Sequence, residues 1–450
     1  MANFTELTAI LSEITWDERD LHFVHPDEMP SRIEALGRRG VRGIRIGLSR
    51  RGRDIFALEA GKGPRVIVAA AGSHADEPTG TVTLLVLAGE LADLQQRGFM
   101  ADCTFCFIPQ LDPDGTDLNW RWMKGPYSYR EYTLYRYRQN DPAQDVEHGI
   151  PLFEEQQMRP EVEAFKRYVD GLPSTEYFAS LHTTHVLGGA VFLIEADECA
   201  DFAPIMGFLR ERASESGLAM DDADLHGLYG IRKLAPGFLT SSRHEDMSEY
   251  YRDNPEMGRK VKMSLIQYMK RCRGAKLALI AELPFLVDEE FNCNEETEFS
   301  LVDYWKEIIR HKEKTLSAMV SLWESLREYA VTGENAFWHD YYEFMLAREP
   351  GEIKALRGSL GRFEGKKAAM RHLYSLFLGR FHDQVMLSLM AMRRLQGLGD
   401  VKALKARAGF ERDFEKAWNE YEKRMTYRVL PLAEQVKLQG AMILAGLLLE

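Results

Sequence analysis

The chain has 450 residues, of which 45% are hydrophobic and 28% are charged. This composition is typical of a folded globular protein and excludes a disordered chain, and the length predicts two or three domains. The formal net charge is −12, which argues against nucleic acid or an anionic membrane surface as the main partner. The longest apolar run, GAMILAGLLL at 440–449, is about half the length that a membrane span needs.

Five cysteines are spread along the chain, and an odd, scattered set indicates reduced thiols in a cytoplasmic protein. The first 20 residues lack the basic start and continuous apolar core of a secretory signal, so we expect a cytoplasmic location. Cys103 and Cys106 form a C-x-x-C pattern inside the apolar stretch CTFCFIP, which favours the interior of a strand over a redox or metal site. The other three are Cys199, Cys272 and Cys293.

From about residue 40 to residue 295, short apolar or β-branched runs alternate with helical patterns. This alternation is typical of an α/β sheet, and we expect a mixed, mostly parallel sheet flanked by helices. Helices are predicted over 79–98 and 159–172. The predicted strands are 43–50, 54–60, 65–71, 104–110, 176–182, 190–196 and 276–284.

The strand pattern ends near residue 296. Between residues 304 and 326, apolar side chains recur at steps of three and four, which predicts one face of a long amphipathic helix. Glycine-containing breaks such as VTGENA and LQGLGD separate further helical stretches. We therefore expect a catalytic domain over 1–295 and an all-α domain over 296–450, whose Met and Trp residues form its core.

Three side chains that can bind a metal come at the ends of predicted strands. His74 and Glu77 follow the strand at 65–71, and His182 ends the strand at 176–182. The stretch around His74 could instead be a turn and a helix N-terminus, and His185 is an alternative to His182. Because loops at the carboxyl ends of parallel strands converge, we expect these side chains to meet. Two histidines and one glutamate with an open fourth position are typical of a catalytic zinc site.

Glu282 ends another predicted strand, at 276–284. A buried carboxylate is costly unless it is used, and hydrolysis at a zinc site needs a general base beside the attacking water. The alternative interpretation is an ordinary salt-bridged residue at a strand end. Four potential functional residues at the ends of three predicted strands nevertheless favour a single catalytic site.

The chain resembles the zinc carboxypeptidase family, which comprises the carboxypeptidase A-like metallopeptidases and their deacylase relatives, the succinylglutamate desuccinylases and aspartoacylases. The resemblance covers roughly residues 43–285 and rests on IGLSRRGRDIFALEAGKGPRVIVAAAGSHADEPTG, FIPQLDPDGTDLNWRW, RPEVEAFKRYV, YFASLHTTH and LALIAELPF. It implies one zinc ion per chain, bound by His74, Glu77 and His182. It also implies that Glu282 is the general base and proton shuttle.

The resemblance is weaker at the substrate-binding residues. The family uses one arginine to polarise the scissile carbonyl and an Asn-Arg pair to hold the terminal carboxylate of the substrate. Here Asn119 is followed by tryptophan, so the Asn-Arg dipeptide is missing. We expect Arg121 to stabilise the oxyanion, and Asn119 and Arg138 to bind the carboxylate. Alternatively, these arginines lie in a solvated, tyrosine-rich loop.

The sequence therefore predicts a zinc-dependent hydrolase, most simply a metallocarboxypeptidase acting on a peptide or small amide with a free carboxylate. The alternative is a deacylase of N-acyl amino acids. A third interpretation is an inactive member whose helical domain binds a partner protein. The helical domain could wall off the substrate pocket or mediate homo-oligomer formation.

Overall fold

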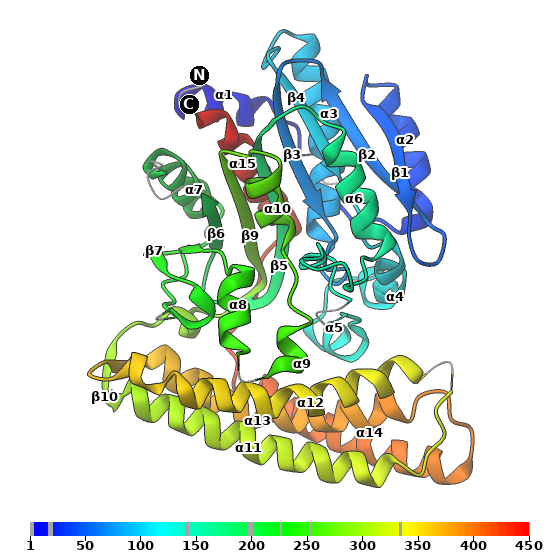
Figure 1. Ribbon diagram of the computed structural model, residues 1–450, viewed down its shortest axis with the longest axis vertical. Coiled ribbons are helices and arrows are strands. Elements are labelled where there is room, and N and C mark those ends of the chain that lie inside the picture. The colour runs from blue at the N-terminus through cyan, green and yellow to red at the C-terminus, as the bar shows by residue number, and fades with distance from the viewer. Residues whose placement is uncertain are drawn as a thin grey trace.

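A mixed β-sheet with helices on both faces forms the upper part of the protein, and a layer of long helices lies below it (Figure 1). The computed structural model describes residues 4–16, 21–139, 144–196, 202–225, 227–252, 254–332 and 335–449. Cys199 lies outside these ranges. Within them, no helix is long and apolar enough to cross a membrane.

The sheet has ten strands in the order β1-β2-β4-β3-β5-β9-β6-β8-β7, and β12 also pairs with β9. Its four central strands, β4, β3, β5 and β9, run parallel to one another, whereas both edges contain antiparallel pairs. The predicted fold class is confirmed. The strands are β1 Arg42–Leu48, β2 Asp54–Gly61, β3 Arg65–Ala71, β4 Cys103–Ile108, β5 Thr175–Leu187, β6 Val191–Ala196, β7 Lys233–Ala235, β8 Phe238–Thr240, β9 Leu277–Val287 and β12 Arg428–Val429.

Each face of the sheet is covered by apolar helices. The helices α3 (Thr79–Gln96), α7 (Ala203–Glu215) and α15 (Leu432–Ala445) pack on one face, and α6 (Pro160–Asp170) and α10 (Leu265–Cys272) pack on the other. The remaining helices of this part are α1 Phe4–Glu13, α2 Met29–Gly37, α4 Pro113–Met123, α5 Tyr129–Tyr135, α8 His244–Tyr250 and α9 Pro255–Gly258.

The two cysteines of the C-x-x-C pattern lie inside β4, as expected. Both side chains are fully buried in the cores of the sheet. Burial raises the pKa of Cys103 and of Cys106 to about 12, so both thiols are protonated at neutral pH. This protonation argues against a redox role.

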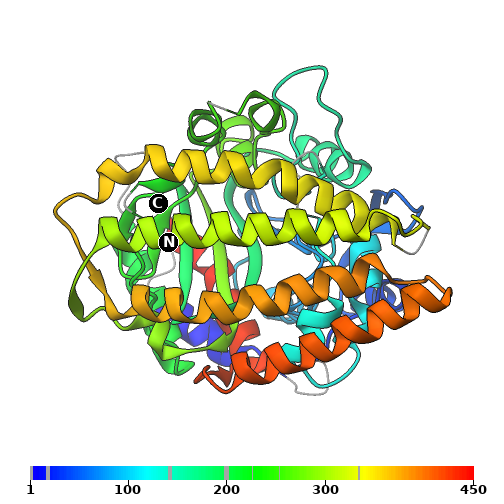
Figure 2. The ribbon, with the colours of Figure 1, turned by 90° about the horizontal axis from the view of Figure 1, so that it is seen from below.

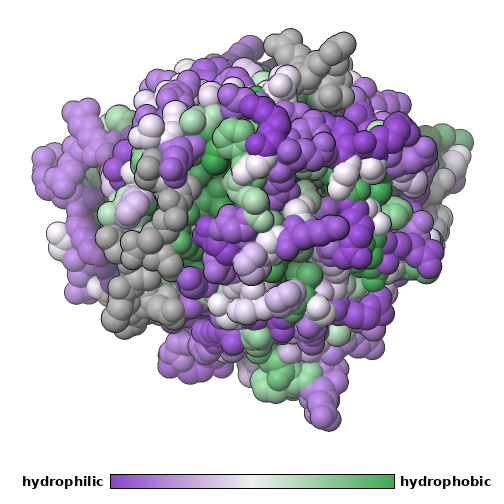
Figure 3. All heavy atoms as spheres, turned by 90° about the horizontal axis from the view of Figure 1, so that it is seen from above, coloured by the Kyte–Doolittle hydropathy of each residue, from purple (hydrophilic) through white to green (hydrophobic). Residues whose placement is uncertain are grey.

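Four long helices form a layer across the carboxyl ends of the central strands (Figure 2). They are α11 Leu301–Leu326, α12 Ala336–Gly358, α13 Met370–Arg394 and α14 Val401–Glu422, and a small sheet of β10 (Glu296–Ser300) and β11 (Lys367–Ala369) joins their ends. One apolar cluster contains Phe285 at the end of β9, Leu389 of α13 and Trp418 of α14. The layer is thus packed firmly against the sheet. The opposite end of the molecule is mainly hydrophilic and has smaller apolar areas (Figure 3).

The end of the chain differs from the expectation of one helical domain over 296–450. After α14 the chain returns to the sheet, where β12 pairs with β9 and α15 packs against α3. Residues 438–445 of α15 are all buried, so this helix needs apolar neighbours on every side. The surface between α3 and α7, over β5 and β9, supplies such surroundings, whereas a single layer of helices does not.

Two glutamine side chains fix α15 to the elements around the predicted metal ligands. Gln435 and Gln439 are buried and accept hydrogen bonds from Thr79 Oγ1 (3.0 Å) and Thr83 Oγ1 (2.7 Å) of α3. Gln439 also donates a hydrogen bond to the backbone oxygen of His182 at 3.1 Å. The last helix therefore connects α3 to β5.

Candidate metal centre

The three predicted metal ligands come together where β3 ends beside β5, which continues past His182 to Leu187. β3 pairs with β5 up to Ala71 opposite Leu181, so His74 in the loop after β3 lies next to His182 in β5. The backbone nitrogen of Glu77 donates to the oxygen of His74 at 3.1 Å, which closes a tight turn before α3. One nitrogen or oxygen from each of the three side chains lies within 4.8 Å of the others. Among the described residues, no other group of His, Cys, Asp or Glu meets this condition.

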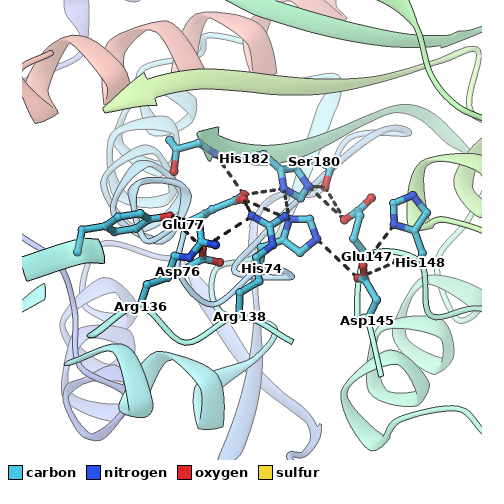
Figure 4. Close-up of polar contacts among 12 residues, drawn as sticks. His74, Asp76, Glu77, Arg136, Arg138, Asp145, Glu147, His148, Ser180 and His182 are labelled. Carbon is cyan, nitrogen blue, oxygen red and sulfur yellow. Dashed lines mark hydrogen bonds and ion pairs between the residues drawn. The ribbon is translucent and has the colours of Figure 1, made fainter. Parts of the chain in front are cut away.

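Both imidazoles turn the same nitrogen towards the Glu77 carboxylate (Figure 4). His182 Nδ1 lies 2.7 Å from Glu77 Oε2 and 3.0 Å from His74 Nδ1, and His74 Nδ1 lies 3.3 Å from Glu77 Oε1. Burial raises the pKa of Glu77, but His74, Arg138 and His182 together hold it well below its usual value. The carboxylate is therefore ionised and able to bind a cation.

A second pair of carboxylates holds the far nitrogens of the two imidazoles. Glu147 Oε2 lies 3.3 Å from His182 Nε2 and accepts a hydrogen bond from Ser180 Oγ at 3.0 Å. Asp145 Oδ1 lies 3.6 Å from His74 Nε2. A carboxylate on Nε2 fixes the ring and leaves Nδ1 for a metal, as in the carboxylate–histidine–zinc arrangement.

This donor set fits zinc. Two imidazole nitrogens and one carboxylate converge, each imidazole has its own supporting carboxylate, and none of the described residues adds a fourth ligand that closes the site. Sequence reasoning missed Asp145 and Glu147. They lie in an irregular segment, and the only signal in the sequence was the acidic pair in DVEHGIP.

Glu282 lies beside the metal centre on the neighbouring strand. β5 and β9 pair in a register that sets His182 directly opposite Glu282. Burial and the negative charge of Glu77 raise the pKa of Glu282 to about 7. A carboxyl group with this pKa can both accept and donate a proton near neutral pH.

Arg138 contacts two of the three metal-site residues. Its guanidinium donates to Glu77 Oε1 and lies next to His74 Nδ1, both at 2.8 Å. These are two of the atoms that converge as metal ligands. When a cation binds to Glu77 and His74, it replaces the contacts of Arg138 with these two side chains.

Asn119 is fully occupied by hydrogen bonds within the protein. Its Nδ2 donates to the backbone oxygens of Gly115 (2.9 Å) and Tyr137 (2.8 Å). Its Oδ1 accepts from Trp122 Nε1 (2.8 Å) and from the backbone nitrogen of Tyr137 (2.9 Å). Asn119 is completely buried and so has no free group for a substrate. Its contacts fix the backbone next to Arg138.

Arg121 lies away from the metal centre. Its side chain is exposed near the end of α4, donates to the Tyr135 hydroxyl at 2.7 Å and stacks on the Tyr135 ring. A helical residue on an exposed face cannot be distinguished from one facing a site by its position in the motif alone. His185, the alternative to His182, is outside the metal cluster and lines a cavity next to it.

Comparison with known families agrees with this geometry. Residues 33–187 match the family model of the zinc carboxypeptidases, and this segment includes His74, Glu77 and His182. Over residues 33–187 the chain is similar to a zinc carboxypeptidase domain. The cofactor of the domain is zinc, and the protein is a hydrolase of the metallopeptidase type. Glu282 and the helical layer lie outside the matched residues.

Several solved structures resemble the zinc carboxypeptidase domain at low identity. A candidate metallopeptidase from Shewanella amazonensis is 13% identical with a TM-score of 0.40, over 57% of this chain and 84% of its own. The carboxypeptidase A from Helicoverpa armigera is 12% identical with a TM-score of 0.39, over 63% and 70%. A metallo-carboxypeptidase from Burkholderia cenocepacia is 17% identical with a TM-score of 0.35, over 58% and 60%. No curated protein sequence matches the chain significantly.

Proposed function

We propose that the protein is a metallocarboxypeptidase, which hydrolyses an amide bond next to the free carboxylate of a peptide or peptide-like substrate. The observation that carries this proposal is the convergence of His74 Nδ1, His182 Nδ1 and the Glu77 carboxylate, with Glu282 opposite His182 on the next strand. A purely structural site would need a fourth protein ligand.

The side chains around the metal have distinct roles in this proposal. Zinc held by His74, Glu77 and His182 supplies a Lewis acid that activates water and polarises the scissile carbonyl. Glu282, opposite His182 on the neighbouring strand, takes a proton from the attacking water and passes it to the leaving nitrogen. Arg138 binds the carboxylate of the substrate, because guanidinium groups pair with carboxylates through two parallel hydrogen bonds.

A deacylase of N-acyl amino acids is the second candidate. It is favoured by the small cavity of about 160 Å³ that lies between Arg138 and the helical layer, because a narrow site suits a small substrate. Both reactions cleave an amide next to a free carboxylate. They differ in the acyl part, which is a peptide in one case and a simple acyl group in the other.

The test compares zinc content with hydrolysis in purified wild type, His74→Ala and Glu282→Gln. The substrates are N-acetylated dipeptides, the same dipeptides with an amidated C-terminus, and N-acetyl amino acids. We expect Glu282→Gln to keep about one zinc per chain and to lose roughly 10²- to 10⁴-fold in kcat, as is typical for a missing general base. His74→Ala is expected to lose both zinc and activity.

Glu289→Gln is the matched control, since Glu289 is exposed just beyond the end of the same strand. Its activity should equal that of the wild type. Amidation of the substrate should abolish cleavage. A wild-type rate in Glu282→Gln, or equal cleavage of free and amidated dipeptides, contradicts the proposal. Cleavage of N-acetyl amino acids alone favours the deacylase.

A further inference from the structure

A cavity separates the metal centre from the helical layer. Its volume is about 160 Å³, enough for about five water molecules. Arg138 forms part of its wall and also contacts the metal-site residues, so the cavity adjoins the position of the scissile bond. The basic residues of its wall are Arg136, Arg138 and His185 from the sheet part, and His382 and Arg393 from α13.

Among the described residues, the wall contains three guanidinium groups and no carboxylate. Two of these groups have acidic neighbours: Arg136 Nε lies 3.9 Å from Asp76 Oδ2, and Arg138 lies 3.7 Å from Asp76 and 2.8 Å from Glu77. Arg393 forms no ion pair with any described residue. One positive charge is therefore left without a partner even before a metal binds.

The environment of Arg393 shows how this unpaired charge is held. The side chain is only 9% exposed, and its guanidinium lies 4.1 Å from the centre of the Trp338 ring. Its Nη2 donates to the backbone oxygens of residues 133, 134 and 136 at 2.9 to 3.2 Å. Its Nε has no hydrogen-bond partner in the described part of the chain. Burial lowers the pKa of Arg393 to about 10.

Zinc binding adds a second unpaired charge. Once Glu77 binds the cation, Asp76 is the only carboxylate among the described residues that still forms an ion pair with any of the three guanidinium groups, and it contacts Arg136 and Arg138 but not Arg393. Burial and Arg136 lower the pKa values of His185 and His382, so these imidazoles are neutral. The three guanidinium groups and the single carboxylate of Asp76 then leave a net charge of two positive units beside a small cavity. A buried charge without a partner is strongly unfavourable, and two carboxylates would compensate for both.

We propose that this cavity binds an acidic C-terminal residue of the substrate, so that the released product is a dicarboxylic amino acid such as glutamate or aspartate. Arg138 and Arg393 bind the two carboxylates, and the helical layer closes the far side of the cavity. The long helices thus determine substrate specificity. This inference rests on the proposed function, because it assumes that the released residue carries a free carboxylate.

The first experiment measures binding without catalysis. L-glutamate and its neutral isostere L-glutamine are titrated calorimetrically into the zinc-loaded protein. We expect glutamate to bind at least about tenfold more tightly, as is typical for a hydrogen bond between charged groups in place of a neutral one. Arg393→Met should remove this preference. Equal binding of the two amino acids to the wild type overturns the proposal.

Arg394→Met is the matched control. Arg394 is the next residue of α13 and is also buried, but its guanidinium donates to the backbone oxygens of Tyr329 and Ala330, and it does not line the cavity. This variant should keep the preference for glutamate. If Arg393→Met does not fold, Arg393→Lys retains the charge and should still bind glutamate more tightly than glutamine. An unchanged preference in folded Arg393→Met contradicts the role of Arg393.

Hydrolysis separates this inference from the proposed function. N-acetylated dipeptides that end in glutamate and in glutamine are compared by kcat/KM. A glutamate preference in binding without hydrolysis of either dipeptide means that the proposed function fails while the binding pocket stands. Hydrolysis of both dipeptides at equal kcat/KM, with equal binding of the two amino acids, means that the proposed function stands and the acidic specificity fails.

Discussion

Glu147 provides the sharpest prediction about zinc affinity. Its carboxylate is 1% exposed, lies 3.3 Å from His182 Nε2, and accepts a hydrogen bond from Ser180. Glu147→Gln keeps the shape of the side chain but removes the negative charge that orients and polarises the imidazole. Changes of this kind outside the metal ligands typically weaken metal binding about 10- to 100-fold. This loss corresponds to roughly 1.4 to 2.7 kcal/mol of binding free energy.

The assay is competition for zinc with a chelator of known affinity at fixed pH, followed for wild type and Glu147→Gln. Glu154→Gln serves as control, because Glu154 is an exposed residue of the following segment and should leave the Kd unchanged. Circular dichroism establishes that each variant is folded. A Kd for Glu147→Gln within twofold of the wild type would falsify the idea that this carboxylate supports the zinc ligand.

Two further predictions concern protons and stability. Burial and Arg138 lower the pKa of His74, but Glu77 and other acidic neighbours raise it to about 9, and the pKa of His182 is raised as well. Zinc must displace these protons when it binds. Its affinity should therefore rise about tenfold per pH unit for each displaced proton as the pH increases from 6 towards 9. A zinc Kd that does not change with pH contradicts this reasoning. Gln439→Leu removes the bonds to Thr83 and to the backbone of His182, and should lower the free energy of unfolding by about 1–3 kcal/mol in a urea titration. A change below about 0.5 kcal/mol refutes the role assigned to this glutamine.

The metal ligands could be predicted because their positions follow from local patterns. His74 and Glu77 follow the end of β3, and the parallel pairing of β3, β5 and β9 brings His182 and Glu282 beside them. The apolar runs before His182 and Glu282 indicated these strands, although β5 and β9 continue beyond both residues to Leu187 and Val287. The same strand and helix periodicities predicted the parallel centre of the sheet and the helix over Leu301–Leu326. These features depend mainly on neighbours in sequence.

Other features depend on distant parts of the chain and left little local signal. Asp145 and Glu147 lie in a segment without regular structure, and only the folded chain brings them to the imidazoles. The distinction between Arg121 and Arg138 is set by which face of α4 is exposed and by how the next loop returns to the site. The apolar run at 440–449 predicts burial, but it does not reveal that its helix packs on the sheet.

The hydrogen bond from Gln439 to the backbone of His182 has a consequence for biosynthesis. The two residues are 257 positions apart, and at about 5–20 residues per second a ribosome needs roughly 13 to 50 s to travel between them. During that interval the nascent chain already contains all three zinc ligands, but β5 lacks the contact that joins it to the last helix. The support that α15 gives to the metal centre therefore forms only after the ribosome has synthesised Gln439, which delays assembly of the complete site during translation.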